Sequence, residues 1–102
     1  MEEKEMQAYR RKLEAKLDKM KAELDKVQAG INEAKADTEV NYIKRLKDLR
    51  SKRNDLQQRL SEVKDTAEST WKDVKTSLDE SWDRLRKEAN ELKSNLSIID
   101  TD

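Results

Sequence analysis

The chain has 102 residues, of which 23 are basic and 23 are acidic, so its formal net charge is zero. It contains no histidine, which is the commonest general base, and no cysteine, which supplies the thiol nucleophile. It also lacks a glycine-rich loop that could bind phosphate. The sequence therefore disfavours an enzyme. A zero net charge also argues against a general nucleic-acid binder, which normally carries a basic surplus.

The rest of the composition is typical of long helices. The chain lacks proline, Gly30 is its only glycine, and 45% of its residues are charged. Chains rich in Ala, Glu, Lys, Leu and Arg that lack turn residues form long helices or coiled coils. No apolar run approaches the roughly 20 residues that cross a bilayer, and the N-terminus does not look like a secretory signal. We therefore expect a soluble cytoplasmic protein with no cofactor and no metal.

Apolar residues recur at helical spacing along nearly the whole chain. From Met6 to Ile99, 27 positions follow one another at steps of three or four residues, and 24 of them are apolar. We call this series the stripe. Three polar residues interrupt it: Arg10, Thr38 and Arg53. They either specify the register of the paired helices or mark places where the apolar face is open to water. The mean step of about 3.6 residues predicts straight, gently supercoiled amphipathic helices, and the stripe argues against disorder.

The stripe predicts a long first helix over residues 3–63 and a second helix over residues 70–97. Turn and cap formers gather at residues 65–69, and Thr70 begins a variant capping box, so the chain is expected to fold back there. Gly30 is a second candidate turn, because glycine costs about 1 kcal/mol inside a helix. Turns at both sites would give a three-helix bundle, whereas a turn near residue 66 alone gives a long antiparallel hairpin.

Charge favours the hairpin. Residues 44–59 carry seven basic and two acidic side chains, whereas residues 73–83 carry four acidic side chains against Lys75. Folding the chain back near residue 66 lays these stretches side by side, and complementary flanking charges set helix orientation in coiled coils. The second helix is too short to reach the stripe on residues 6–38, so this half is expected to bury its apolar face in another molecule. The prediction is an all-α hairpin that self-associates into a homo-oligomer.

The candidate interaction residues fall into three groups. The first lies on the part of the stripe that the second helix does not reach. The second is a pair of tryptophans three helical turns apart, which either face the first helix near Leu60, Val63, Leu49 and Arg53 or form an exposed face for a protein or lipid partner. The third is basic, and it either pairs with the acidic second helix or contacts phosphate or anionic lipid. These groups are Leu13, Leu17, Met20, Leu24 and Val27; Trp71 and Trp82; and Lys44, Arg45 and Arg50.

The sequence resembles a family of small bacterial coiled-coil proteins associated with stress responses, over roughly residues 8–90. The resemblance implies a soluble, stress-linked protein and no catalytic residue. Its most specific part is the pair Trp71 and Trp82, eleven residues apart. The motifs that carry it are Ala8-Tyr-Arg-Arg-Lys-Leu-Glu-Ala-Lys-Leu, Ala34-Lys-Ala-Asp, Tyr42-Ile, Leu46-Lys-Asp-Leu-Arg-Ser-Lys, Trp71-Lys-Asp-Val-Lys and Ser81-Trp-Asp-Arg-Leu.

The sequence thus predicts a single helical coiled-coil domain over residues 1–102. The first functional hypothesis is a non-enzymatic structural or interaction protein that acts through helix pairing and self-assembly, with an unknown protein partner. The alternative is reversible binding of amphipathic helices to a membrane surface or another anionic surface. A second alternative is weak nucleic-acid binding through residues 44–53.

Overall fold

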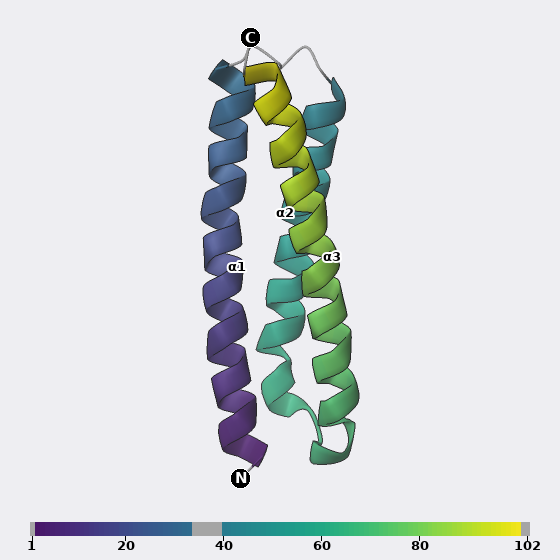
Figure 1. Ribbon diagram of the computed structural model, residues 1–102. Helices are drawn as coiled ribbons and strands as arrows, with labels where there is room; N and C mark the ends of the chain where they lie inside the picture. Colours follow the sequence, from purple (N-terminus) through teal and green to yellow (C-terminus); the bar gives the residue numbers. More distant parts are fainter. Residues whose placement is uncertain (1, 34–39, 101–102) are drawn as a thin grey trace.

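The computed structural model describes residues 2–33 and 40–100, and the side chains of residues 4–33, 41–67 and 69–95. Three helices pack side by side into a rod with extents of 53 × 19 × 16 Å (Figure 1). They are α1 (Glu2–Glu33), α2 (Val40–Ser61) and α3 (Glu68–Asp100), with a short 3-10 helix, η2 (Val63–Asp65), between the last two. α2 runs antiparallel to both of its neighbours, and α1 and α3 run in the same direction.

The single helix expected over residues 3–63 is wrong. α1 continues through Gly30 and ends at Glu33, and α2 begins at Val40 and returns beside α1. The architecture is therefore the three-helix bundle, which was the alternative to the hairpin, although Gly30 is not the turn. Burial of apolar surface stabilises a fold by about 25 cal/mol per Å². The extra reversal is favoured because it lets one chain bury both halves of the stripe. Thr38 lies outside the described residues.

The second reversal lies between α2 and α3, and it overlaps the predicted turn at residues 65–69. After η2 the backbone becomes extended at Thr66, whose N–H donates to the carbonyl oxygen of Val63 at 2.9 Å. α3 then begins at Glu68, two residues before the predicted start. The capping role expected for Thr70 is wrong, because its hydroxyl donates to the carbonyl oxygen of Ala67 at 3.0 Å and does not accept from a helix N–H.

The core confirms the stripe as the buried face. Each buried hydrophobic residue among the described side chains is a stripe position, and none of the described polar or charged residues is buried. All three helices and η2 contribute to one continuous apolar cluster. Its members are Leu13, Leu17, Met20, Leu24, Val27, Ile31, Leu46, Leu49, Leu56, Leu60, Val63, Trp71, Leu78, Leu85, Ala89 and Leu92.

The first group of predicted interaction residues therefore lies inside the chain's own core. Their exposed fractions range from 0% at Leu17 to 5% at Val27. The expectation that another molecule must cover this half of the stripe is wrong, because α2 and α3 both pack against α1. The error follows from the predicted long helix, which would have carried α1 beyond the reach of α3. The remaining residues of this group are Leu13, Met20 and Leu24.

Candidate functional site

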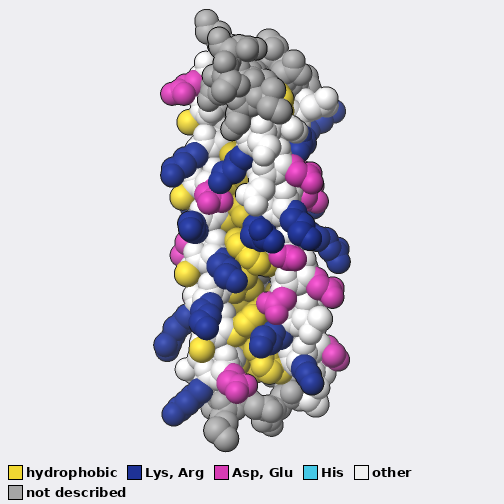
Figure 2. All heavy atoms as spheres, in the orientation of Figure 1, with side chains coloured by type: hydrophobic (Ala, Val, Ile, Leu, Met, Phe, Trp, Pro, Cys, Tyr) yellow, Lys and Arg dark blue, Asp and Glu magenta, His cyan; other side chains and the backbone are white. Residues whose placement is uncertain are grey.

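The line along which α1 meets α3 is the candidate functional site, and we call it the α1–α3 seam. Two aromatic residues on it, Tyr9 and Trp82, are only partly buried and pack against the core. Figure 2 shows apolar atoms exposed along the rod between the two helices, with basic and acidic side chains on both sides. The seam is thus a narrow apolar line with a mixed-charge border.

Tyr9 anchors one end of the α1–α3 seam. Its ring meets the ring of Trp71 edge-on, with centroids 5.3 Å apart and an interplanar angle of 80°. Its hydroxyl donates to Oδ1 of Asp79 at 2.6 Å, and Nζ of Lys75 lies 5.7 Å from the ring centroid. Burial raises the pKa of Tyr9 well above its usual range, and the hydrogen bond to the Asp79 carboxylate raises the pKa further. The phenol therefore stays protonated and acts as a donor that ties α1 to α3.

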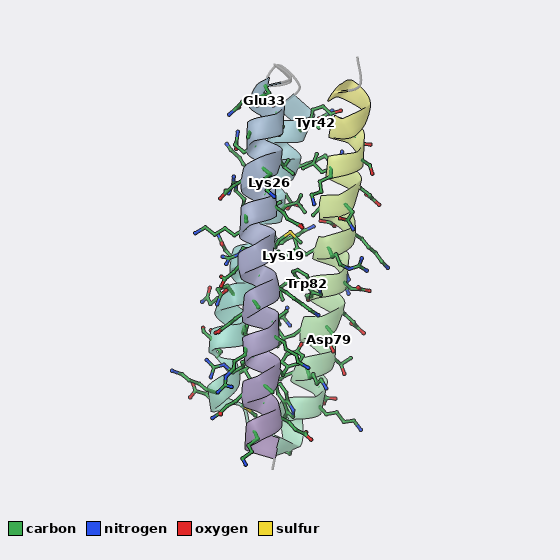
Figure 3. The ribbon with its side chains drawn as sticks, turned by 60° about the vertical axis from the view of Figure 1, so that its left-hand side comes forward. Lys19, Lys26, Glu33, Tyr42, Asp79 and Trp82 are labelled. Carbon is green, nitrogen blue, oxygen red and sulfur yellow. The ribbon has the colours of Figure 1, made fainter. Side chains whose placement is uncertain are left out.

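Trp82 occupies the middle of the α1–α3 seam and is partly exposed. Nζ of Lys16 lies 5.9 Å from the centroid of its ring, within the range of a cation–π contact. Figure 3 shows Trp82 and Asp79 on the side of α3 that faces α1. Further along, Nζ of Lys93 lies 3.4 Å from Oε2 of Glu23, which adds an ion pair between the same helices.

The two tryptophans thus contact α1 as well as the core. Trp71 is 7% exposed and belongs to the same apolar cluster as Leu60 and Val63, which agrees with the packed interpretation. Its aromatic partner is Tyr9, however, on the part of the chain that the sequence placed out of reach. Trp82 lies under Lys16 of α1. The sequence prediction placed Trp82 beside Leu49 and Arg53 and did not include this contact.

The interruption of the stripe at Arg53 is a polar link between α2 and α1. Nε of Arg53 donates to the backbone carbonyl oxygen of Leu17 at 3.1 Å, and Nη2 lies 3.6 Å from Asp18. The side chain is only 12% exposed, so these contacts compensate for its burial. Arg10, another interruption, has a buried Nε with no hydrogen-bond partner among the described residues.

The basic stretch of α2 divides its ion pairs between two helices. Nη1 of Arg50 lies 3.0 Å from Asp25 of α1, and Nζ of Lys52 lies 2.8 Å from Glu88 of α3 and 3.0 Å from Asp48. Among the described side chains, no ion pair joins residues 44–59 to residues 73–83, so the expected acidic partners are wrong. The cause is the position of α2, which packs against both α1 and α3.

The other two predicted basic interaction residues, Lys44 and Arg45, form no ion pair with a described side chain. Lys44 is exposed, and Arg45 is half-buried in a shallow groove between α2 and α3 that Glu88 and Glu91 also line. A neighbouring groove of about 230 Å³ contains Arg59, which donates to the hydroxyls of Ser77 and Ser81. Both grooves are open and mix the two signs of charge, so neither selects an anion.

The described residues offer no metal centre and no membrane span. Within residues 2–33 and 40–100, no three Asp or Glu side chains gather closely enough to hold a metal ion. In the same ranges, no helix is both long and apolar enough to cross a bilayer. The described contacts across the α1–α3 seam are an aromatic pair, a hydrogen bond, a cation–π contact and an ion pair.

Comparisons with known proteins give no match. No protein-family profile fits this sequence, and no curated protein and no solved structure matches it significantly.

Proposed function

We propose that the chain is a non-enzymatic interaction protein that works by pairing amphipathic helices with a copy of itself or with another helical protein. The observation that supports this is the α1–α3 seam, where apolar side chains stay partly exposed beside charges of both signs. An amphipathic helix from a partner gains affinity by laying its apolar face in such a line. The charged border then selects orientation and partner.

The tryptophan at the middle of the α1–α3 seam makes the proposal testable. Trp82 is a large apolar side chain that is only partly covered, and aromatic residues of this kind dominate interface energetics. Sedimentation velocity from micromolar to millimolar protein should show a mass that rises above 12.0 kDa. Trp82→Ser should suppress that rise, whereas Lys72→Ser, at an exposed position of the same helix, should not.

Two results together would contradict the proposal. The chain would stay monomeric at every concentration, and the Trp82→Ser variant would bind each helical partner as the original chain does. Association that is equally weakened by both substitutions would point to loss of helicity, which circular dichroism measures directly.

A stress-linked role in the cytoplasm is the finer part of the proposal, and it rests on the resemblance described above. A strain that lacks the gene should survive heat, osmotic and oxidative challenge less well than its parent, and the unmodified gene should restore survival. Complementation by the Trp82→Ser variant at equal abundance would separate the stress role from helix pairing.

Membrane-surface binding is the second candidate, because Trp82 and Lys16 place an indole and an ammonium together at the protein surface. Such a pair suits the interface of an anionic bilayer. Anionic vesicles should then shift the tryptophan emission to the blue, and neutral vesicles should not. Binding of nucleic acid by residues 44–53 has less support, since Arg50 and Lys52 already have carboxylate partners.

A further inference from the structure

Two lysines stand over aromatic rings on the α1–α3 seam. Nζ of Lys75, in α3, lies 5.7 Å from the ring centroid of Tyr9 in α1. Nζ of Lys16, in α1, lies 5.9 Å from the ring centroid of Trp82 in α3. The two contacts are reciprocal, because each helix supplies one ammonium group and one ring.

The two contacts are one heptad apart along the α1–α3 seam. Tyr9 and Lys16 are separated by seven residues in α1, and Lys75 and Trp82 are separated by seven residues in α3. Because α1 and α3 run in the same direction, both helices advance together by about two turns, or about 10 Å, from one contact to the next. The spacing is the one at which side chains recur on the same face of a packed helix.

Neither lysine forms an ion pair with a described side chain. Two acidic residues of α3 near these contacts have other partners. The carboxylate of Asp79 accepts the hydroxyl of Tyr9. Asp83 lies 3.0 Å from Nη2 of Arg86, whose hydrogen bond is the main cause of the lowered pKa of Asp83, whereas Lys16 contributes least. Both lysines are exposed, so they are available to carboxylates from another molecule.

We infer that the α1–α3 seam binds an amphipathic helix that carries two carboxylates one heptad apart, one for Lys16 and one for Lys75. Seven residues are close to two turns, so both carboxylates lie on one side of the partner helix. Apolar side chains three or four residues from them cover the exposed part of Trp82. The inference deepens the proposed function, on which it rests, by specifying the charge of the partner.

The lysines and the tryptophan have different roles in this complex. An exposed ion pair changes affinity by only about two- to fivefold, whereas a large apolar side chain that becomes covered supplies much of the binding free energy. Like charges that face each other across an interface exclude the wrong partner. Trp82 therefore supplies affinity, and the two lysines select an acidic helix over a basic one.

Two synthetic helices test the inference. Each has about 21 residues, or three heptads, with leucines on one face and no tryptophan. One peptide carries glutamate once per heptad beside the leucines, and the other carries lysine at the same positions. Fluorescence anisotropy of the labelled peptides measures affinity, and the emission of Trp82 in the Trp71→Phe variant reports contact with the seam. The glutamate peptide should bind about tenfold more tightly and should shift this emission to the blue.

Substitution of both lysines should remove the preference. Lys16→Gln combined with Lys75→Gln should weaken binding of the glutamate peptide by about fivefold or more, and Lys16→Glu combined with Lys75→Glu should make the lysine peptide the tighter ligand. The matched control combines Lys21→Gln with Arg84→Gln. Lys21 is exposed and makes no cation–π contact with a described ring, and Arg84 lines the groove between α2 and α3, so this variant should keep the preference.

The possible results separate this inference from the proposed function. Equal binding of the two peptides would overturn the charge selection and leave helix pairing intact. If neither peptide binds, the inference fails: self-association of the chain would then assign the seam to a second copy, and binding to anionic vesicles would assign the lysines to a membrane surface. If neither peptide binds and the chain also stays monomeric, the proposed helix pairing fails with it.

Discussion

The leucine core and the α1–α3 seam hold the same bundle together in different ways. Core residues such as Leu17 and Leu60 have no exposed surface and depend on all three helices being in place. The seam instead joins two helices through a phenol–carboxylate hydrogen bond, a lysine over an indole and an ion pair. We conclude that the core supplies most of the stability and that the seam is the part of the bundle most easily altered without unfolding it.

Truncation in the core should have the largest effect. Leu17→Ala removes a side chain with 0% exposure and leaves a cavity, so the free energy of unfolding should fall by about 2–5 kcal/mol. Urea denaturation followed by circular dichroism measures the change. Lys19→Ala, at an exposed position of the same helix, should change it by less than about 0.5 kcal/mol. Equal effects of the two substitutions would mean that Leu17 is not in the core.

Truncation in the middle of the α1–α3 seam should have a smaller effect. Trp82 is only partly buried, so Trp82→Ala should cost about 2 kcal/mol, below the 3–5 kcal/mol typical of a fully buried tryptophan. In the Trp71→Phe variant, the emission of Trp82 should lie between those of buried and exposed indoles. A loss as large as that of Leu17→Ala would show that the seam belongs to the core.

Removal of one hydroxyl from the α1–α3 seam should cost about 1 kcal/mol. Tyr9→Phe keeps the edge-on contact with Trp71 but removes the donor to Asp79, and one hydrogen bond contributes on that order. The matched control is Tyr42→Phe, at the other partly buried tyrosine, which makes no side-chain hydrogen bond with a described residue. Urea denaturation should show little change in the control, and equal losses in the two variants would remove the special role of the Tyr9–Asp79 bond.

Alkaline pH should weaken the same link. Because the pKa of Tyr9 is higher in the folded chain than in the unfolded chain, its stabilising contribution is complete below about pH 10 and is lost as the pH rises toward the folded-state value. The stability advantage of the original chain over Tyr9→Phe should therefore be constant up to about pH 10 and shrink above it. A difference that stays constant through this range would contradict the assignment.

The cation over Trp82 should make the smallest contribution. Lys16→Gln removes the charge and keeps most of the side-chain length, and an exposed cation–π contact is worth about 0.5 kcal/mol. Lys19→Gln is the matched control, since Lys19 is an exposed lysine of the same helix and the cation–π contacts among the described residues involve Lys16 and Lys75 instead. Thermal melting at low salt should separate the two variants; identical midpoints would indicate that the contact adds nothing.

The amino-acid sequence predicts the buried face of the bundle but not the path of the chain. Leu24 and Leu85 lie in the core as the stripe requires, because helical spacing is a local property. The end of α1 at Glu33 has no local signal; it depends on burial between segments far apart in the sequence. Gly30 is a candidate turn from the sequence because glycine weakens helices. In the structure α1 continues through Gly30, and a Cβ at this position would meet nothing within 4 Å.

The α1–α3 seam was missed for the same reason. A helix predicted to extend to residue 63 left no partner for Tyr9, so its link with Asp79 was not expected. One sequence signal was present: Met6, Tyr9 and Leu13 are themselves spaced by three and four residues. Tyr9 can therefore take the place between Met6 and Leu13 that the stripe gives to Arg10. The tryptophans were identified correctly as residues on the stripe, but their contacts with α1 require the third helix.

The hydrogen bond from Arg53 to the carbonyl oxygen of Leu17 has a mechanical consequence. Leucines repeat along α1 at nearly equal spacing, so a displacement of one turn, about 5.4 Å, would bring similar side chains back into contact with α2. Apolar packing alone therefore resists axial sliding weakly. Arg53 holds α1 at one register through this hydrogen bond and through its ion pair with Asp18, and tension along the rod must break both contacts before the helices can slip. Single-molecule pulling of an Arg53→Met variant should accordingly record slippage at lower force than the original chain.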